Sequence, residues 1–244
     1  MFERLIDQLR KNTFLEKKEY KLLIENRQEC ADYLFENARQ VRDSVYGNRV
    51  YIRGLIEISN HCKNDCLYCG IRRSNRNLAR YRLYEDDILN CVKQGYELGF
   101  RTFVLQGGED AYYNDDMLCT VLREIKSLFP DCAVTLSLGE RSFESYQKLK
   151  AAGVDRYLLR HETAAKHHYE RLHPPDMSFE HRVQCLKNLK SLGYQTGAGF
   201  MVGSPYQTAD DLAGEFMFLK AILPEMVGIG PCVPHCDTPF GGFK

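Results

Sequence analysis

The chain has 244 residues, of which 33 are basic and 33 acidic, so its formal net charge is zero. This balance provides no overall attraction to nucleic acid or to an anionic membrane, and we expect neither as a partner. No apolar run approaches the ~20 residues that a membrane span requires, and the N-terminus interleaves charged and apolar residues, unlike a secretory signal. Ten cysteines in a chain of this length are too sparse for a disulfide scaffold. We therefore expect a cytoplasmic enzyme or binding protein with reduced thiols.

The first fifty residues space their apolar side chains as helices do, and Thr13 with Glu16 predicts a capping box. From residue 51 onward, short apolar runs alternate with amphipathic stretches. Two of these stretches have clear helix starts, at Ser178 and Thr208. The apolar runs predict six strands, at residues 51–58, 101–106, 132–138, 154–159, 194–200 and 225–230.

Six alternations of about 30 residues each are typical of parallel βαβ units. Three glycines stand where a helix must turn into the next strand: Gly99, Gly153 and Gly193. We therefore predict an α/β fold, a (β/α) barrel of the TIM type with about six units. A complete eight-unit barrel needs roughly 60 residues more, so we expect the barrel to lack its last two strands. The predicted domains are an N-terminal helical extension, residues 1–50, and the barrel, residues 51–244.

Three cysteines follow the first predicted strand: Cys62, Cys66 and Cys69, spaced as C-x3-C-x2-C. In an α/β barrel the chemistry lies at the carboxyl ends of the strands. Soft thiolates suit either zinc or an iron–sulfur cluster. Zinc prefers a fourth ligand, and His61 is too close to Cys62 to be a convenient one. A four-iron cluster held by three cysteines leaves one iron open. These residues favour a catalytic cluster, with a structural metal site as the alternative.

With Tyr68 before the last cysteine, the motif resembles that of radical S-adenosylmethionine (SAM) enzymes. The resemblance extends from about residue 20 to the C-terminus. It implies two cofactors, a 4Fe–4S cluster and SAM. The open iron would bind the amino and carboxylate groups of SAM, and Tyr68 would lie beside the cofactors. An electron from the cluster then cleaves SAM to methionine and a 5′-deoxyadenosyl radical. This chemistry requires an electron donor such as ferredoxin or flavodoxin.

Residues at other strand ends extend the resemblance. Gly107, Gly108 and Glu109 resemble the Gly-Gly-Glu motif that contacts the SAM amino group, although a strand-to-helix turn of this composition is also ordinary. The resemblance implies that Glu162 meets the SAM ribose or amino group and that Arg182 meets its carboxylate. The alternatives are a buried ion pair for Glu162 and a solvated helix residue for Arg182.

An apolar slot for adenine is implied around Met201 and Val202, with Ile229 from the sixth strand. Small residues surround these positions, so each strand end can approach a flat ligand closely. The alternative is that these residues only form tightly packed strand ends.

Within the superfamily, three runs resemble the HydE family of FeFe-hydrogenase maturases: Asn64–Asn75, Tyr157–Thr163 and Gly228–Pro231. This resemblance implies a role in assembling the hydrogenase H-cluster, by radical attack on a cysteine-bound iron carbonyl–cyanide precursor. The substrate would be a small organometallic or amino-acid-derived molecule, and other hydrogenase maturation proteins would be partners. Arg53 and Arg160 would hold the anionic substrate, unless Arg53 is merely a charge on an exposed strand face.

Other functions remain open. Methylornithine synthase and biotin synthase are relatives of the same family. A non-catalytic iron–sulfur or zinc protein, or a shortened and inactive maturase, would also contain the cysteine motif. Gly-Gly-Glu and Arg182 argue against a passive metal site, which has no use for them.

Three further features are given no function. We interpret the five arginines between residues 72 and 82 as a solvated or cluster-covering loop. Cys232 and Cys236, on either side of His235, are interpreted as ordinary loop thiols because no fourth metal ligand is evident. The pair His167–His168 and the nearby His173 are expected in an exposed loop, because Pro174 and Pro175, which break a helix, follow them.

Overall fold

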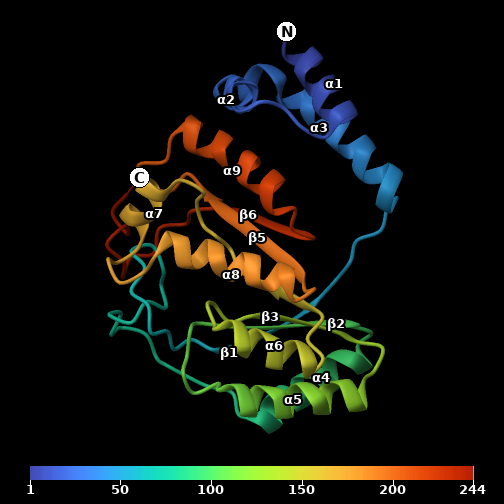
Figure 1. Cartoon of the computed structure of the whole chain (residues 1–244), viewed down its shortest axis with the longest axis vertical. Coiled ribbons are helices and arrows are strands. Elements are labelled where there is room, and N and C mark those ends of the chain that lie inside the picture. Colours follow the sequence, from blue (N-terminus) through green and yellow to red (C-terminus); the bar gives the residue numbers. More distant parts are fainter. Residues whose placement is uncertain (244) are drawn as a thin grey trace. The chain divides into compact units, whose positions relative to one another are not determined.

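The structure is a computed structural model that describes residues 1–243. A parallel sheet of six strands, in the order β1-β2-β3-β4-β5-β6, forms the centre of one compact unit, residues 52–205 and from 224 onward (Figure 1). Among the described residues each strand pairs only with its neighbours in sequence, so the sheet is open between β1 and β6. The six predicted strands are confirmed: β1 (Gly54–Ser59), β2 (Thr102–Gly107), β3 (Ala133–Ser137), β4 (Arg156–Leu158), β5 (Gln195–Val202) and β6 (Met226–Pro231).

Helices connect these strands, as parallel pairing requires. The predicted start at Ser178 is confirmed, because its side chain accepts a hydrogen bond from the backbone N–H of His181. The three predicted turn glycines have positive φ angles of 96°, 106° and 74°, which a residue with a Cβ adopts only at a cost. The helices of this unit are α4 (Glu85–Glu97), α5 (Asp115–Leu128), α6 (Phe143–Ala151), α7 (Lys166–Leu172) and α8 (Phe179–Ser191).

The core lies between the sheet and these helices. Leu105 and Leu136 on neighbouring central strands are fully buried. Tyr157 on β4 contacts Tyr146 and Tyr194 edge to face, with ring centroids 5.1 and 5.9 Å apart. Such aromatic pairs add to the stabilisation that burial provides. This packing fixes the strands, and therefore the loops at their carboxyl ends.

The backbone is irregular at the carboxyl end of β1, and β5 and β6 approach each other closely in mid-strand. The register between β1 and β2 shifts between Glu57 and Ser59, directly before the cysteine loop. Such a shift redirects the chain that follows it. Between β5 and β6, a Cβ placed on Gly199 would lie 2.0 Å from the carbonyl oxygen of Gly228. Only glycine permits this close approach of the two strands.

The second compact unit, residues 1–51 and 206–223, is helical. It contains α1 (Phe2–Asn12), α2 (Lys17–Glu25), α3 (Arg27–Tyr46) and α9 (Ala209–Ile222). Tyr20 stacks on Phe216 with ring centroids 4.7 Å apart, and Lys17 forms an ion pair with Asp210 at 2.6 Å. Thr208 caps α9 as predicted. The compact unit includes residues 206–223, whereas the predicted helical domain ended at residue 50; the division into domains stays a prediction.

Two local predictions are wrong. Thr13 is the left-handed C-cap of α1, and the capping box of α2 instead joins Glu16 and Glu19, because Glu16 directly precedes the helix. The residues His167–His168 lie in α7 rather than in an exposed loop, since α7 already ends at Leu172, before the prolines. His168 is fully buried, with a ring nitrogen 3.1 Å from Thr163 Oγ1. Among residues 1–243, no helix has both the length and the apolar character needed to cross a bilayer.

Candidate active site

The cysteine loop follows β1 and is tied to neighbouring elements through its backbone. The N–H of Lys63 donates to the carbonyl of Glu109 at 2.9 Å, and the N–H of Leu67 donates to Leu172 at the end of α7, also at 2.9 Å. A Cβ on Gly108 would lie 2.2 Å from the carbonyl oxygen of His61. The glycine after β2 therefore allows this strand end to pack directly against the start of the cysteine loop.

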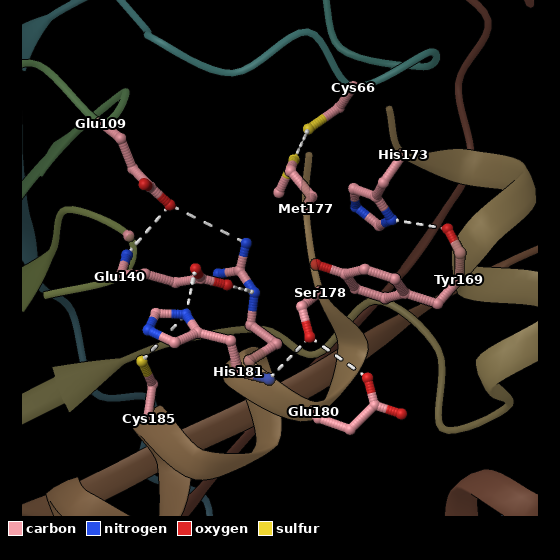
Figure 2. Close-up of polar contacts among 12 residues, drawn as sticks. Cys66, Glu109, Glu140, Tyr169, His173, Met177, Ser178, Glu180, His181 and Cys185 are labelled. Atoms are coloured by element: carbon pink, nitrogen blue, oxygen red, sulfur yellow. Dashed lines mark hydrogen bonds and ion pairs between the residues drawn. The ribbon is translucent and has the colours of Figure 1, made fainter. Parts of the chain in front are cut away.

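The three motif cysteines are free and partly buried. Burial raises the pKa of the Cys66 thiol to about 12, with further contributions from Cys69 and Cys62. Burial also raises the pKa of Cys69. Thiolates in this position are therefore costly without a neighbouring positive charge, which iron ions supply. Met177 adds a fourth sulfur, with Sδ 3.7 Å from Cys66 Sγ (Figure 2).

The basic segment after the cysteines closes the loop. Arg80 donates to the carbonyl oxygens of Asn60, Ile71, Arg72 and Asn75, at 2.7–3.1 Å for the last three. Arg82 forms an ion pair with Asp110 at 2.6 Å. Burial raises the pKa of Asp110, but hydrogen bonds from Arg82 and Ser59 outweigh burial and hold this pKa below its usual value. Arg80 and Arg82 thus have structural partners.

Tyr68 links the cysteine loop to α7. Its hydroxyl lies 3.1 Å from Nε2 of His173. Nδ1 of the same ring lies 2.9 Å from the carbonyl oxygen of Tyr169 (Figure 2). Because a carbonyl only accepts, Nδ1 carries the proton and Nε2 accepts from Tyr68. Burial lowers the pKa of His173 to about 4, so its ring is neutral near pH 7. Sequence reasoning missed His173, which it placed in an exposed loop.

A buried polar cluster lies beyond the cysteine loop, formed by Glu109 after β2, Glu140 after β3 and Arg182 in the first turn of α8 (Figure 2). Arg182 Nε lies 2.8 Å from Glu140 Oε1, and a terminal guanidinium nitrogen lies 3.9 Å from Glu109 Oε1. Glu109 Oε1 also accepts from the backbone N–H of Glu140 at 3.0 Å, and Lys63 Nζ lies 3.1 Å from its Oε2. The predicted residues Glu109 and Arg182 are therefore brought together.

Three buried atoms of this cluster have ion-pair contacts but no well-aligned hydrogen bond: Glu109 Oε2, Glu140 Oε1 and Arg182 Nε. Burial opposes the charge on Arg182, but Glu140 and Glu109 raise its pKa above the usual value. Buried groups of native proteins normally have hydrogen-bond partners, so such exceptions are typical of ligand sites. The cluster is suited to a ligand that has both a positive and a negative group.

Sequence reasoning missed Glu140. A signal was available, because Gly139-Glu140 follows the third strand as Gly108-Glu109 follows the second. Both acids come directly after a glycine at the carboxyl end of a strand. Their backbone positions alone place them at one edge of a parallel sheet.

The ends of β4 and β5 form the next part of the site. Glu162 has a φ of 65°, unusual for a residue other than glycine, and its backbone pairs with Phe200 on β5. Strained backbone of this kind occurs preferentially at functional sites. Arg160 forms an ion pair with Glu162 at 3.2 Å and donates to the carbonyl of Phe200 at 2.9 Å. Met201 is buried in a small cluster with Leu172 and Phe240, and Tyr68 of the cysteine loop packs against this cluster.

The remaining predicted site residues, Val202, Ile229 and Arg53, lie at different places in the fold. Val202 and Ile229, at the ends of β5 and β6, leave 37% and 52% of their surface exposed. Arg53 is exposed and precedes β1, at its amino end, whereas the cysteine loop follows the carboxyl end. The structure therefore does not bring Arg53 to the other candidate residues. The predicted strand began too early by three residues, at 51 rather than 54.

Among the described residues, one group of three donors converges to within 4.8 Å: His235, Cys236 and Asp237, in a turn after β6. The Cys236 side chain in this group is exposed. The sulfurs of Cys62, Cys66 and Cys69 do not converge in this way.

A family model described as the radical SAM superfamily matches residues 56–219. The chain belongs to the radical SAM superfamily. It is 51% identical over 211 residues to the FeFe-hydrogenase maturase subunit HydE of Thermotoga maritima, covering 86% of this chain and 60% of the relative. It is 29% identical over 224 residues to 3-methylornithine synthase of Methanosarcina barkeri, covering 88% of this chain and 61% of that protein.

The radical SAM fold is confirmed by a crystal structure of methylornithine synthase, which superposes with a TM-score of 0.90 at 26% identity. That match covers 98% of this chain and 71% of the other. The predicted TIM-type architecture and the predicted similarity to HydE are therefore both confirmed. Membership in the superfamily implies a 4Fe–4S cluster and SAM as cofactors, and a reductant. The chain spans about 60% of the length of the two curated relatives.

Proposed function

We propose that this chain acts as a radical SAM enzyme, with Cys62, Cys66 and Cys69 holding the 4Fe–4S cluster. The observation that carries the proposal is the placement of these thiols in one closed loop beside the buried Glu109–Glu140–Arg182 cluster. When bound, the cluster supplies the electron that cleaves SAM to methionine and a 5′-deoxyadenosyl radical. A reducing cytoplasmic compartment suits the proposal, because the three thiols must remain unoxidised.

The polar cluster matches the methionyl end of SAM. The Glu109 carboxylate is suited to accept from the ammonium group, and the Arg182 guanidinium is suited to donate to the carboxylate. Both side chains are at least nine-tenths buried, which strengthens such contacts by excluding water. Gly107 and Gly108 allow the backbone to approach the same group.

The strand ends of β4 to β6 are proposed to hold the adenosine. Glu162 is assigned to the ribose hydroxyls or the amino group, because its carboxylate comes from the strained turn after β4. Met201, Val202 and Ile229 provide apolar surface for the adenine ring. Tyr68 is proposed to lie beside the cofactors, held in place by His173.

We further propose that the activity serves maturation of an FeFe-hydrogenase. The support is the 51% identity to the HydE maturase subunit, against 29% to 3-methylornithine synthase. The substrate is then a small organometallic or amino-acid-derived anion, for which Arg160 is the candidate contact. Ferredoxin or flavodoxin is the proposed electron donor, and other hydrogenase maturation proteins are the proposed partners. A methylornithine-synthase-like activity is the second candidate, favoured by the TM-score of 0.90.

The cofactor proposal is tested by anaerobic reconstitution with iron and sulfide, dithionite reduction, and electron paramagnetic resonance (EPR) with and without SAM. We expect a reduced cluster signal that changes shape when SAM is added. Cys69→Ala should lose both the signal and SAM cleavage. The matched control is Cys91→Ala, which removes an exposed cysteine far along the sequence from the motif and should behave as the parent. SAM cleavage by Cys69→Ala would contradict the assignment.

The products formed distinguish the two candidate activities, hydrogenase maturation and methylornithine synthesis. Hydrogenase activity in cells that lack their own HydE should be restored by this chain and by Cys91→Ala, but not by Cys69→Ala. Formation of 3-methylornithine by the reconstituted protein, without restored hydrogenase activity, would favour the second candidate.

A further inference from the structure

We infer that Glu140 is a positioning residue for SAM, orienting both Glu109 and Arg182. This inference rests on the proposed function and adds a residue to it. Glu140 contacts the two side chains through different groups: its backbone N–H donates to Glu109 Oε1 at 3.0 Å, and its carboxylate lies 2.8 Å from Arg182 Nε (Figure 2). One residue thus connects the groups assigned to the ammonium and the carboxylate of SAM.

The backbone at Glu140 is held firmly. The preceding Gly139 has a φ of 75°, and a Cβ there would lie 2.0 Å from Glu109 Cγ, so the position requires glycine. The hydroxyl of Tyr157 donates to the carbonyl of Gly139 at 2.9 Å. The following Arg141 forms an ion pair with Asp115 at 3.1 Å. A fixed backbone gives the N–H of Glu140 a constant direction toward Glu109.

The carboxylate of Glu140 is held from two sides. Its Oε1 lies near Arg182 Nε, and its Oε2 accepts from Nδ1 of His181 at 2.7 Å (Figure 2). His181 and Arg182 are adjacent in the first turn of α8, so Glu140 joins the end of β3 to the start of this helix. The Glu140 side chain is only 14% exposed, which limits the freedom of its carboxylate to turn away.

The charge of Glu140 has a specific consequence for Arg182. Without it, the nearest carboxylate of the cluster would be Glu109, 3.9 Å from a terminal nitrogen of Arg182. Arg182 would then turn toward Glu109 and compete with the ammonium group of SAM for that carboxylate. With Glu140 in place, the guanidinium is paired at Nε, and its nearest terminal nitrogen stays 3.9 Å from Glu109 Oε1, which is longer than a hydrogen bond. Glu140 therefore keeps the positive and negative SAM contacts separate.

The inference is tested on the reconstituted holoprotein by titrating SAM against the EPR signal of the reduced cluster. Glu140→Gln keeps the shape of the side chain and the backbone N–H but removes the charge. We expect SAM to bind ~10–100-fold more weakly, by analogy with the loss seen when residues that orient metal ligands are replaced. Glu140→Asp should recover part of the affinity. The matched control is Glu180→Gln, which changes an exposed acid in the first turn of α8 that is paired with Lys166.

Iron content and melting temperature distinguish positioning from general stability. Positioning predicts parental iron content in Glu140→Gln together with weaker SAM binding. Equal SAM affinity in Glu140→Gln and Glu180→Gln would overturn the inference. If Glu140→Gln loses its cluster, His181→Ala decides, because it releases the other side of the carboxylate: weaker SAM binding supports positioning, and parental binding overturns it. If the parent protein itself gives no response to SAM, the proposed function fails instead.

Discussion

The carboxyl ends of β1–β3 and those of β4–β6 differ in the partners of their side chains. At the first three strands, Glu109 and Glu140 already share Arg182 within a buried cluster, and the cysteine loop is closed by its own hydrogen bonds. At the last three, Val202 and Ile229 expose apolar surface. The first region is a preformed polar site, and the second is an exposed apolar surface.

This difference corresponds to the two ends of the proposed ligand. A charged amino-acid group is costly to bury unless its partners are already oriented. A flat aromatic ring needs only apolar contact and close approach, which small residues such as Gly199 and Gly228 allow. We expect substitutions in the first region to affect both stability and SAM binding, and those in the second to affect binding with little effect on stability.

The largest effect on stability is expected from Arg182→Met. Removing this guanidinium leaves Glu109 and Glu140 buried together without their shared partner, which costs about 3–5 kcal/mol for buried ion pairs. Arg160→Met removes an arginine whose side chain is 33% exposed, and we expect a loss of about 1 kcal/mol or less. Denaturant unfolding of both variants measures the contrast. Equal losses would break the distinction between the two regions.

Gly108→Ala tests the contact between β2 and the cysteine loop. The new Cβ would lie 2.2 Å from the carbonyl oxygen of His61 and 2.7 Å from Cys62 Cβ, so backbone must move. We expect a loss of about 3 kcal/mol, the upper part of the range for overpacking, together with reduced iron content. Gly230→Ala, at the end of β6, has no atom within 4 Å of the new Cβ and should be tolerated. Normal iron content in Gly108→Ala would show that the loop can shift without harm.

The first region was also the more predictable from sequence. Cys62, Cys66 and Cys69 lie in one contiguous run, and Gly108-Glu109 directly follows a well-defined strand. Such local patterns report function because the carboxyl ends of parallel strands meet at one edge. Glu140 was missed although the same pattern preceded it, since its role appears only through contact with Arg182, 42 positions later in the sequence.

Two other differences between the expected and the observed positions of residues, His173 and Arg53, have different physical causes. His173 was placed in a loop because the prolines that follow it were taken to end the helix earlier, and only tertiary packing shows its ring to be buried. Arg53 was assigned to the substrate through the family resemblance, and that role stays a prediction; the apolar run at residues 51–58 does not reveal that hydrogen bonding begins only at Gly54. A shift of three residues moves a side chain from the sheet to the segment before it.

His173 connects the two regions and should make stability depend on pH. Burial lowers its pKa in the folded state to about 4, from 6.5 in the unfolded chain. The unfolded state therefore binds a proton first as the pH falls, and stability decreases between about pH 6.5 and pH 4. The shift corresponds to a loss on the order of 3 kcal/mol. Unfolding of the parent and of His173→Gln should be compared across this range. A parent and variant with parallel pH profiles would show that His173 is not responsible.

The smallest effect is expected from Arg53→Ala. The side chain is exposed and lies at the amino end of β1, away from the cysteine loop. Exposed substitutions of this kind change stability by about 0.5 kcal/mol or less. Restoration of hydrogenase activity should remain within about twofold of the parent, because no step of the site depends on a charge at this end of the strand. The same assay with Arg160→Ala provides the comparison, since Arg160 lies at the carboxyl end of β4 and is the remaining candidate for an anionic substrate. A greater loss with Arg53→Ala than with Arg160→Ala would place a functional contact at the opposite edge of the sheet from all the others.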